Sequence, residues 1–340
     1  MGPVGGAARR FVSWGEILWD LFPEGRRLGG APANVAYHLA ALGAEAALVS
    51  RVGDDEPGRA ALAALAAAGV DVAAVQTDRA RPTGAVGVEL VAGEARYRFH
   101  PNCAWEHIEW DARASAAVTE ASAICFGTLS QRLPTARAAL ETALSAARGP
   151  DAPATERPLA VCDLNLRPVD QNADLLRWSL AAADVVKLNQ REEELLGQLF
   201  GQRDVVEWLC DDLGVAVVAV TRGSGGCRII ARADRAGRAA ESGDNATDQN
   251  LIDRGPRAID QAGWPAAPGG DTVGCGDAFT AVLALGLTVR SPLEQIARAA
   301  CRYAGAVAGQ RGATPLLPRA LIVEIREALG LGHSPTDLSS

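Results

Sequence analysis

The chain has 340 residues, of which 48% are hydrophobic, and it carries a formal net charge of −8 at pH 7. This length suffices for one large core, and the acidic balance without a basic run argues against nucleic acid as the main partner. Residues 1–10 lack an apolar signal core, and no stretch approaches the ~20 apolar residues of a membrane span. We therefore expect a cytoplasmic protein without a membrane partner.

Cysteine, histidine and lysine usage narrows the chemistry. Seven cysteines and four histidines occur without Cys-x-x-Cys spacing or Cys/His pairs at ligand spacing, which predicts reduced thiols and no zinc site. Lys187 is the only lysine, and no Gly-x-x-x-x-Gly-Lys-Ser/Thr run exists. The common lysine-dependent phosphate motifs are therefore excluded. Any bound phosphate is expected to be held by backbone amides, arginines and a metal ion.

Apolar, β-rich runs alternate with Ala- and Leu-rich runs of helical period along most of the chain. This alternation predicts a three-layer α/β/α fold with a mostly parallel central sheet. Such sheets bind ligands at the carboxyl ends of their strands. Strands are expected at residues 10–14, 46–52, 122–126, 158–164, 184–187 and 215–220. Helices are expected at residues 33–42, 58–68, 134–147, 173–182, 190–200 and 278–287.

Two segments depart from this alternation and predict a small antiparallel flap. They are residues 19–28, and residues 82–100 with strands at 84–91 and 95–99. We expect one α/β domain over 8–330, a lid of about 17–29 and 82–102 inserted in it, and a C-terminal tail at 331–340. The Gly-, Asp- and Arg-rich residues 231–270 predict loops with short strands.

The first candidate site follows the first strand. Asp20 offers a carboxylate to sugar hydroxyls, and Asn34 adds a donor and an acceptor from the next helix. Gly29 and Gly30 let a substrate approach the backbone. The structural alternative is a turn aspartate beside a glycine linker.

A second candidate site is the Asp-Leu-Asn-Leu-Arg run at 163–167. In an extended strand, Asp163, Asn165 and Arg167 share one face. Arg167 can then hold phosphate oxygens in a bidentate way. An Asp–Arg salt bridge that closes the strand end is the alternative.

A third candidate site lies where the strand ending at Lys187 meets a helix with three glutamates in its first turn. Asn189 and Glu192 can organise Mg²⁺ through water, because Mg²⁺ usually keeps several waters. Asn189 is also a good N-cap, and the glutamates complement the helix dipole. The local sequence leaves both interpretations open.

The Thr-Arg-Gly-Ser-Gly-Gly run at 221–226 follows an apolar strand and suits nucleotide phosphates or ribose. Its candidate contacts are Thr221, Gly223 and Gly226. An apolar strand-like stretch follows this run, whereas a dinucleotide fingerprint would open a helix. Dinucleotide binding is therefore disfavoured.

The most informative segment is the Gly-Gly-Asp-Thr-Val-Gly-Cys-Gly-Asp turn at 269–277, which runs into an apolar helix. Glycines let backbone N–H groups approach a ligand, and the helix N-terminus adds unpaired donors, so anions are favoured. A carboxylate in such a turn suggests a base beside a transferring phosphoryl group. This indicates a kinase with Asp277 as the base. An ordinary loop with a helix N-cap is the alternative.

Over almost its full length the chain resembles the ribokinase-like (PfkB) carbohydrate kinases. Residues 271–277 are similar to that family's Asp-Thr-x-Gly-x-Gly-Asp signature, and residues 29–34, Gly-Gly-Ala-Pro-Ala-Asn, are similar to its N-terminal one. The resemblance implies a ribokinase-like fold with a β-sheet lid over the sugar, and ATP and Mg²⁺ as cofactors. Some members also use K⁺, and in many the lid forms a dimer contact, so a homodimer through the lid is an open alternative.

The same resemblance implies roles for individual residues. Asp277 is the expected catalytic base, with an anion hole of Gly274, Cys275 and Gly276, where Cys275 stands in place of the commoner alanine. The expected sugar contacts are Asp20, Gly29, Gly30, Asn34, Arg98 and Arg167. The expected nucleotide contacts are Asn189, Thr221, Gly223, Gly226 and Thr272, with Glu192 near Mg²⁺ through water.

Within the family, residues 29–34, 163–168 and 97–100 look most like bacterial fructokinases, which implies D-fructose as acceptor and fructose 6-phosphate as product. Similar elements occur in 2-keto-3-deoxygluconate kinases, whose carboxylate substrate needs a cation such as Arg98 or Arg167. Other sugar or nucleoside kinases of the family remain alternatives. From other classes, a catalytically silent sugar-sensing protein stays open, and a dinucleotide-dependent oxidoreductase is opposed by the missing fingerprint.

Overall fold

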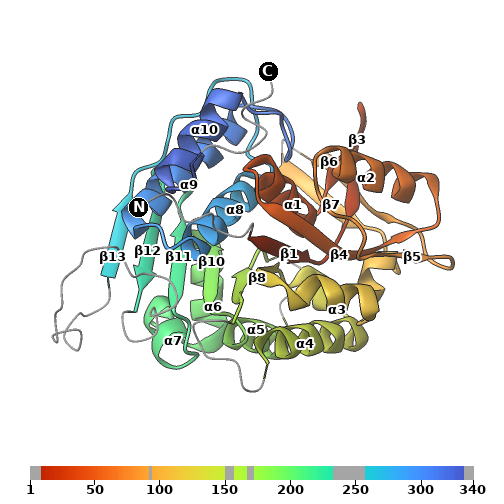
Figure 1. The fold of residues 1–340 in the computed structure, drawn as a ribbon, viewed down its shortest axis with the longest axis horizontal. Helices are drawn as coiled ribbons and strands as arrows, with labels where there is room; N and C mark the ends of the chain where they lie inside the picture. The colour runs from red at the N-terminus through yellow and green to blue at the C-terminus, as the bar shows by residue number, and fades with distance from the viewer. Residues whose placement is uncertain (1–8, 92–93, 150–156, 167–171, 233–256, 333–340) are drawn as a thin grey trace, which may run out of the picture.

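A large β-sheet lies between two groups of helices (Figure 1). The computed structural model describes residues 9–91, 94–149, 157–166, 172–232 and 257–332. These residues form the three-layer α/β/α arrangement with a mostly parallel sheet, so the predicted fold class is confirmed.

In the described part of the chain the main sheet has nine strands, in the order β13-β12-β11-β10-β9-β8-β1-β4-β5. Neighbouring strands from β5 to β11 run parallel, whereas β12 and β13 add antiparallel pairs at one edge. Parallel strands covered on both faces need continuous apolar runs, which is why these segments were recognisable in the sequence. The bounds are β1 Arg10–Trp14, β4 Glu45–Gly53, β5 Val75–Asp78, β8 Ala121–Phe126, β9 Leu159–Asp163, β10 Val185–Asn189, β11 Val217–Thr221, β12 Cys227–Ala231 and β13 Arg257–Gln261.

Each face of the sheet has its own apolar cluster. Alternation along β1 sends Phe11 into the cluster with α1, α8 and α9, and sends Val12 and Trp14 into the cluster with α3 to α7. The first face is covered by α1 Ala31–Ala41, α2 Glu56–Ala67, α8 Cys275–Thr288, α9 Leu293–Ala308 and α10 Arg319–Ala328. The second face is covered by α3 Ala112–Thr119, α4 Pro134–Arg148, α5 Ala173–Ala181, α6 Gln190–Phe200 and α7 Val205–Asp211.

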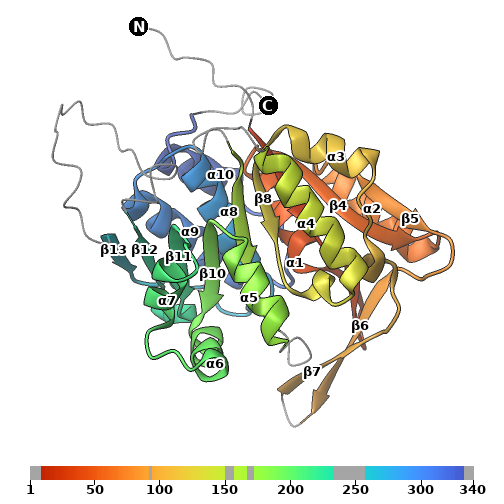
Figure 2. The ribbon, with the colours of Figure 1, turned by 90° about the horizontal axis from the view of Figure 1, so that it is seen from below.

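A second, four-stranded sheet projects from the body of the molecule (Figure 2) and has the order β3-β2-β6-β7. It occupies the two segments predicted as a flap. The prediction that the flap is wholly antiparallel was wrong, because β2 pairs with β6 in parallel. Both strands follow parallel strands of the main sheet, β1 and β5, and so leave the same edge in the same direction. The bounds are β2 Leu18–Phe22, β3 Gly25–Gly29, β6 Gly84–Val91 and β7 Glu94–Phe99.

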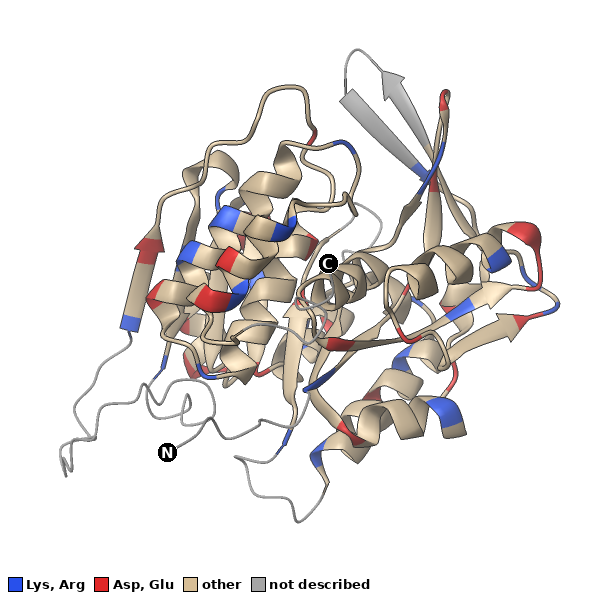
Figure 3. Cartoon of the chain, turned by 45° about the horizontal axis from the view of Figure 1, so that its top comes forward, with Lys and Arg blue, Asp and Glu red and all other residues tan. Residues whose placement is uncertain are grey.

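Acidic and basic residues are interspersed over the outer helices and connections (Figure 3). In this view of the described residues, the basic residues do not gather into a stripe. In this same part of the chain, no helix is both long enough and apolar enough to cross a bilayer.

Candidate active site

The candidate site lies where the strand order of the main sheet reverses. Because β1 is flanked by β8 on one side and β4 on the other, the loops after β1 and β8 diverge and leave a crevice at the carboxyl edge. A cavity of about 810 Å³ occupies this place, and it extends along the ends of β9, β10 and β11 to the N-terminus of α8.

Most of the site residues that were predicted from the sequence line this cavity. Gly29, Arg98 and Glu192 are absent from its lining, and Arg167 lies outside the described residues. The predicted residues that line it are Asp20, Gly30, Asn34, Asn189, Thr221, Gly223, Gly226, Thr272, Gly274, Cys275, Gly276 and Asp277.

The anion-binding turn has the geometry that its glycines predict. Gly274 is the N-cap of α8 with φ of 77°, and a Cβ placed on it would lie 2.5 Å from Cα of Ala313. Only glycine meets both the conformation and the close approach. The helix therefore begins at Cys275, and the unpaired N–H groups of its first turn face the cavity end where an anion is favoured.

Asp277 lies in this first turn, and its exposure is only 7%. The side-chain amide of Asn34, on α1, donates to Oδ2 of Asp277 across 2.7 Å. The other amide atom, Oδ1 of Asn34, is buried without a hydrogen-bond partner among the described residues. A buried acceptor of this kind is costly unless a ligand donor reaches it, so the pair suits a hydroxyl-bearing substrate.

The predicted extension of β9 was wrong. The strand ends at Asp163, and Asn165 adopts a left-handed conformation with φ of 39°, so the run does not present one polar face. Asp163 pairs with Lys187, whose Nζ donates to Oδ1 across 2.9 Å, whereas Arg167 lies outside the described residues. Thr280 on α8 donates to Oδ2 across 2.7 Å.

Asn189 and Glu192 form a capping box at the start of α6. The side chain of Asn189 accepts from the amide of Glu192, whose Oε2 accepts from the amide of Asn189. Oε1 of Glu192 accepts from the amide of Leu166, and burial raises the pKa of this carboxyl group. Within the described ranges, no three His, Cys, Asp or Glu residues gather as a metal site. The capping role is thus present, and the Mg²⁺ role stays a prediction.

The turn after β11 opens a strand, β12, as its sequence indicated. Gly226 has φ of 94°, and a Cβ on it would lie 2.0 Å from the carbonyl oxygen of Gln261, so glycine is required here. Trp264 and Gly305 line the same end of the cavity. They come from segments far along the chain, and for that reason sequence reasoning missed them.

Sequence reasoning also missed Phe99 and Lys187, which line the cavity. Along β7, side chains alternate between the two faces, so Phe99 lines the cavity whereas its neighbour Arg98 is exposed. The available signal for Lys187 was its place near the carboxyl end of a buried strand, next to Asn189.

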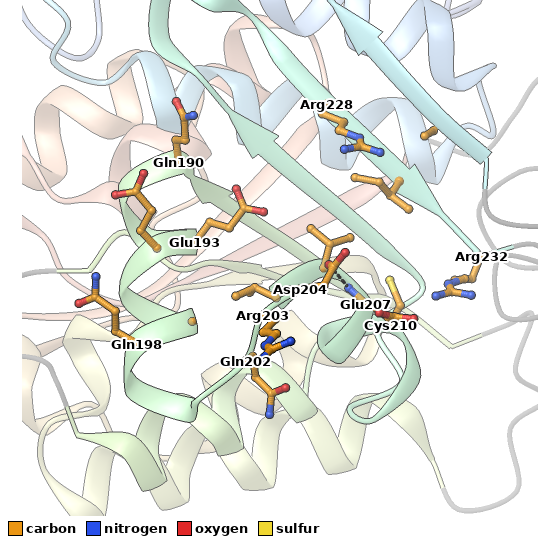
Figure 4. A pocket seen from close by; sticks show the side chains of 16 residues that line it. Gln190, Glu193, Gln198, Gln202, Arg203, Asp204, Glu207, Cys210, Arg228 and Arg232 are labelled. Carbon is orange, nitrogen blue, oxygen red and sulfur yellow. Dashed lines mark hydrogen bonds between the residues drawn. The ribbon is translucent and has the colours of Figure 1, made fainter.

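A second cavity, of about 910 Å³, lies between α6, α7 and β12 (Figure 4). Its wall mixes acidic groups such as Glu193 and Asp204 with basic groups such as Arg203 and Arg228. None of the predicted site residues lines it, although it is slightly larger. Its charges of both signs define no single ligand chemistry.

The chain belongs to the pfkB family of carbohydrate kinases, whose family model matches residues 24–248 and 260–320. Fructokinase-1 of Oryza sativa subsp. japonica is 29% identical over an alignment of 342 positions, which covers 93% of this chain and 96% of that protein. A fructokinase of Escherichia coli is 31% identical over an alignment of 242 positions, which covers 64% of this chain and 72% of that protein. The structure of a fructokinase with bound ATP from Xylella fastidiosa has a TM-score of 0.77 at 19% identity and covers 95% of this chain and 100% of that one, which shows the common fold. The predicted family is thereby confirmed, and fructokinases are prominent among its relatives.

Proposed function

We propose that the protein transfers the γ-phosphoryl group of ATP to a primary hydroxyl of a small sugar, with D-fructose as acceptor and fructose 6-phosphate as product. The observation that carries this proposal is the buried Asp277 carboxylate, which lies beside the Gly274–Gly276 turn and accepts a hydrogen bond from Asn34. A base next to an anion-binding turn is the arrangement that phosphoryl transfer needs.

In this mechanism Asp20, Gly30 and Asn34 hold the sugar, and Asp277 accepts the proton of the attacking hydroxyl as the new O–P bond forms. The amides of residues 274–277 and the positive end of α8 stabilise the charge on the phosphoryl oxygens. The turn at 221–226, with Asn189 and Thr272, takes the nucleotide. The second sheet acts as a lid that excludes water, which would otherwise compete as acceptor.

ATP is expected to arrive with Mg²⁺, which neutralises charge on the phosphates. We propose that Glu192 reaches this ion through water, since its carboxylate oxygens accept backbone hydrogen bonds and the residue does not line the cavity. We include K⁺ as a further proposed cofactor and assign no ligand residues to it. A fructokinase double mutant from Vibrio cholerae was solved with fructose, ADP and potassium ion. We also include in the proposal a homodimer in which the lid forms the contact between the two subunits.

The described lining of the cavity favours a neutral sugar over a keto acid, and Arg167, the other predicted cation for a carboxylate, lies outside the described residues. A substrate carboxylate needs a cation, but Arg98 is exposed on β7 and does not line the cavity. Among the described lining residues the one cation is Lys187, and it lies against Gly276, where the phosphoryl group rather than the sugar is expected. Phe99 lines the cavity instead, which suits the apolar face of a sugar.

An ATP-consumption assay with Mg²⁺ over fructose, 2-keto-3-deoxygluconate, ribose, tagatose 6-phosphate and adenosine tests this proposal. We expect fructose-dependent turnover, and we expect Asp277→Asn to lower kcat by ~10²–10⁴-fold while ATP binding persists, because only the base is lost. The matched control Glu141→Gln neutralises an acid on α4 and should leave kcat unchanged.

Turnover of Asp277→Asn at the wild-type rate would refute the role of this residue. Turnover with another acceptor keeps the mechanism and replaces the sugar. Sugar binding with no turnover on any acceptor would favour the sensing alternative and overturn the kinase proposal.

A further inference from the structure

The only lysine of the sequence lies at the candidate phosphate site. Lys187 is 5% exposed, yet it belongs to the lining of the cavity. It stands in β10, directly opposite Asp163 in the register of β9 and β10. Lysine is rarely buried unless it is paired, and the pair here lies at the edge of the sheet where ligands bind.

The ammonium group of Lys187 lies directly against the anion-binding turn. A Cβ placed on Gly276 would be 2.7 Å from Nζ of Lys187. A side chain at this position would therefore displace the ammonium from its present place beside the turn, which gives Gly276 a reason to be glycine that is unrelated to backbone conformation. The turn and the lysine occupy adjoining space, although 89 positions (276 − 187) separate them.

One network holds the ammonium group in place. Oδ1 of Asp163 accepts from Lys187, and Oδ2 accepts from Thr280, one turn into α8 from Gly276. The same hydroxyl oxygen lies 3.0 Å from the carbonyl oxygen of Gly276, which is a longer, alternative acceptor for its single proton. Within the described residues Nζ makes no other hydrogen bond, so two of its three donors remain for a ligand.

The charges around Lys187 favour the protonated form of its ammonium group. Burial lowers the pKa of Lys187, but the carboxylates of Asp163, Glu192 and Asp277 raise it further, so the pKa lies above its ordinary value and the group stays charged. The same cavity end holds the Cys275 thiol, whose pKa burial raises to about 11. Lys187 is thus the positive group among three carboxylates at the place where a phosphoryl group, itself anionic, is expected.

We propose that Lys187 is the buried cation of the anion hole: its ammonium group supplies fixed positive charge and hydrogen-bond donors to the phosphoryl group during transfer. This inference rests on the proposed function, since it needs a phosphoryl group at the Gly274–Gly276 turn. It also revises the expectation that amides, arginines and a metal alone hold the phosphate. Preorganised charge in a site of low dielectric acts mainly on the transition state.

The test compares Lys187→Met with the double variant Lys187→Met/Asp163→Asn. The single variant leaves Asp163 buried without its cation and is expected to lose thermal stability, whereas the double variant removes both charges and is expected to regain it. In both variants we expect kcat to fall by ~10²–10³-fold with the Kd of ATP changed by less than about threefold. Affinity for ADP with aluminium fluoride, a mimic of the transferring phosphoryl group, should fall together with kcat.

Two controls separate charge from structure. Asp163→Asn alone keeps the ammonium group and should lower kcat less than Lys187→Met does. Arg326→Met removes another buried cation, on α10, where Arg326 bonds to the carbonyl oxygens of Leu42 and Gly332. It should lower the melting temperature without changing kcat.

A stable double variant with wild-type kcat and wild-type affinity for the aluminium fluoride complex would overturn the inference. So would a loss of ATP affinity with kcat unchanged, since that result describes uniform binding. If the wild-type protein turns over no acceptor, the proposed function fails first, and the two failures are thereby distinguished.

Discussion

Three glycines of the site serve different physical purposes. Gly30 has φ of 104°, and a Cβ on it would lie 2.4 Å from the carbonyl oxygen of Glu16. Gly274 combines a left-handed conformation with contact to Ala313, whereas Gly276 has an ordinary helical conformation and is limited by Lys187. The same residue type thus serves backbone geometry at two positions and space for a cation at the third.

Cys275, between two of these glycines, is expected to be replaceable. Burial, with the nearby charges of Asp271 and Asp277, raises the pKa of its thiol to about 11, so the thiol is neutral at pH 7 and contributes no charge to phosphoryl transfer. Cys275→Ala should leave kcat within about twofold of wild type. Steady-state kinetics checks this, and iodoacetamide should inactivate wild type only slowly at pH 7. A tenfold loss of kcat in the alanine variant would contradict it.

At the scale of elements, two helices bring together Asn34 and Asp277, the predicted sugar contact and the proposed base. α1 and α8 both begin at a glycine with positive φ, and together they bring Asn34 within 2.7 Å of Asp277. One turn beyond Asn34, His38 bonds to Tyr303 on α9 and to the carbonyl oxygen of Ala313. Because Ala313 also touches Gly274, the back of the anion-binding turn is held by α1 and α9.

Asn189 caps α6 and also lines the cavity. Its contribution to stability and its proposed contribution to nucleotide binding can therefore be measured separately with two substitutions. Asn189→Ala should lower the free energy of unfolding by about 1 kcal/mol, whereas Asn189→Ser keeps a capping oxygen and should lose only a fraction of that. If Asn189 contacts the nucleotide, both variants should raise the KM of ATP. Urea unfolding and ATP kinetics measure the two effects. An unchanged KM in the serine variant would limit Asn189 to its structural role.

For the whole molecule, the buried His38 predicts how stability depends on pH. Burial lowers the pKa of His38 from its ordinary value of 6.5 to about 4 in the folded protein. Between these values the unfolded chain binds a proton that the folded protein resists, so the free energy of unfolding should fall as the pH drops from 6.5 toward 4. The loss amounts to roughly 3 kcal/mol, since each pKa unit corresponds to about 1.4 kcal/mol.

Urea unfolding of wild type and His38→Gln at several pH values in this range measures the effect. The glutamine variant has no group that titrates here at this position, so its stability should change less with pH than that of wild type. Equal slopes for the two proteins would show that other groups control the pH dependence.

Periodicity and short motifs allowed the sequence by itself to predict the three layers, the flap segments, the family and the turn that carries Asp277. These features are local, because apolar alternation reports burial and glycine reports backbone conformation within a few residues. Short or weakly periodic elements such as α3, α7 and β5 were not predicted, because their conformation depends on the elements that they pack against.

Only the tertiary structure decided which strand ends and helices meet. Asn34 and Asp277 are separated by 243 positions, and Asp163 and Thr280 by 117. In the structure, β9 ends at Asp163, and Phe99 rather than Arg98 lines the cavity. The ammonium group of Lys187 lies next to Gly276. Such contacts follow from strand order and helix packing, which join distant segments and leave no periodic trace in the sequence.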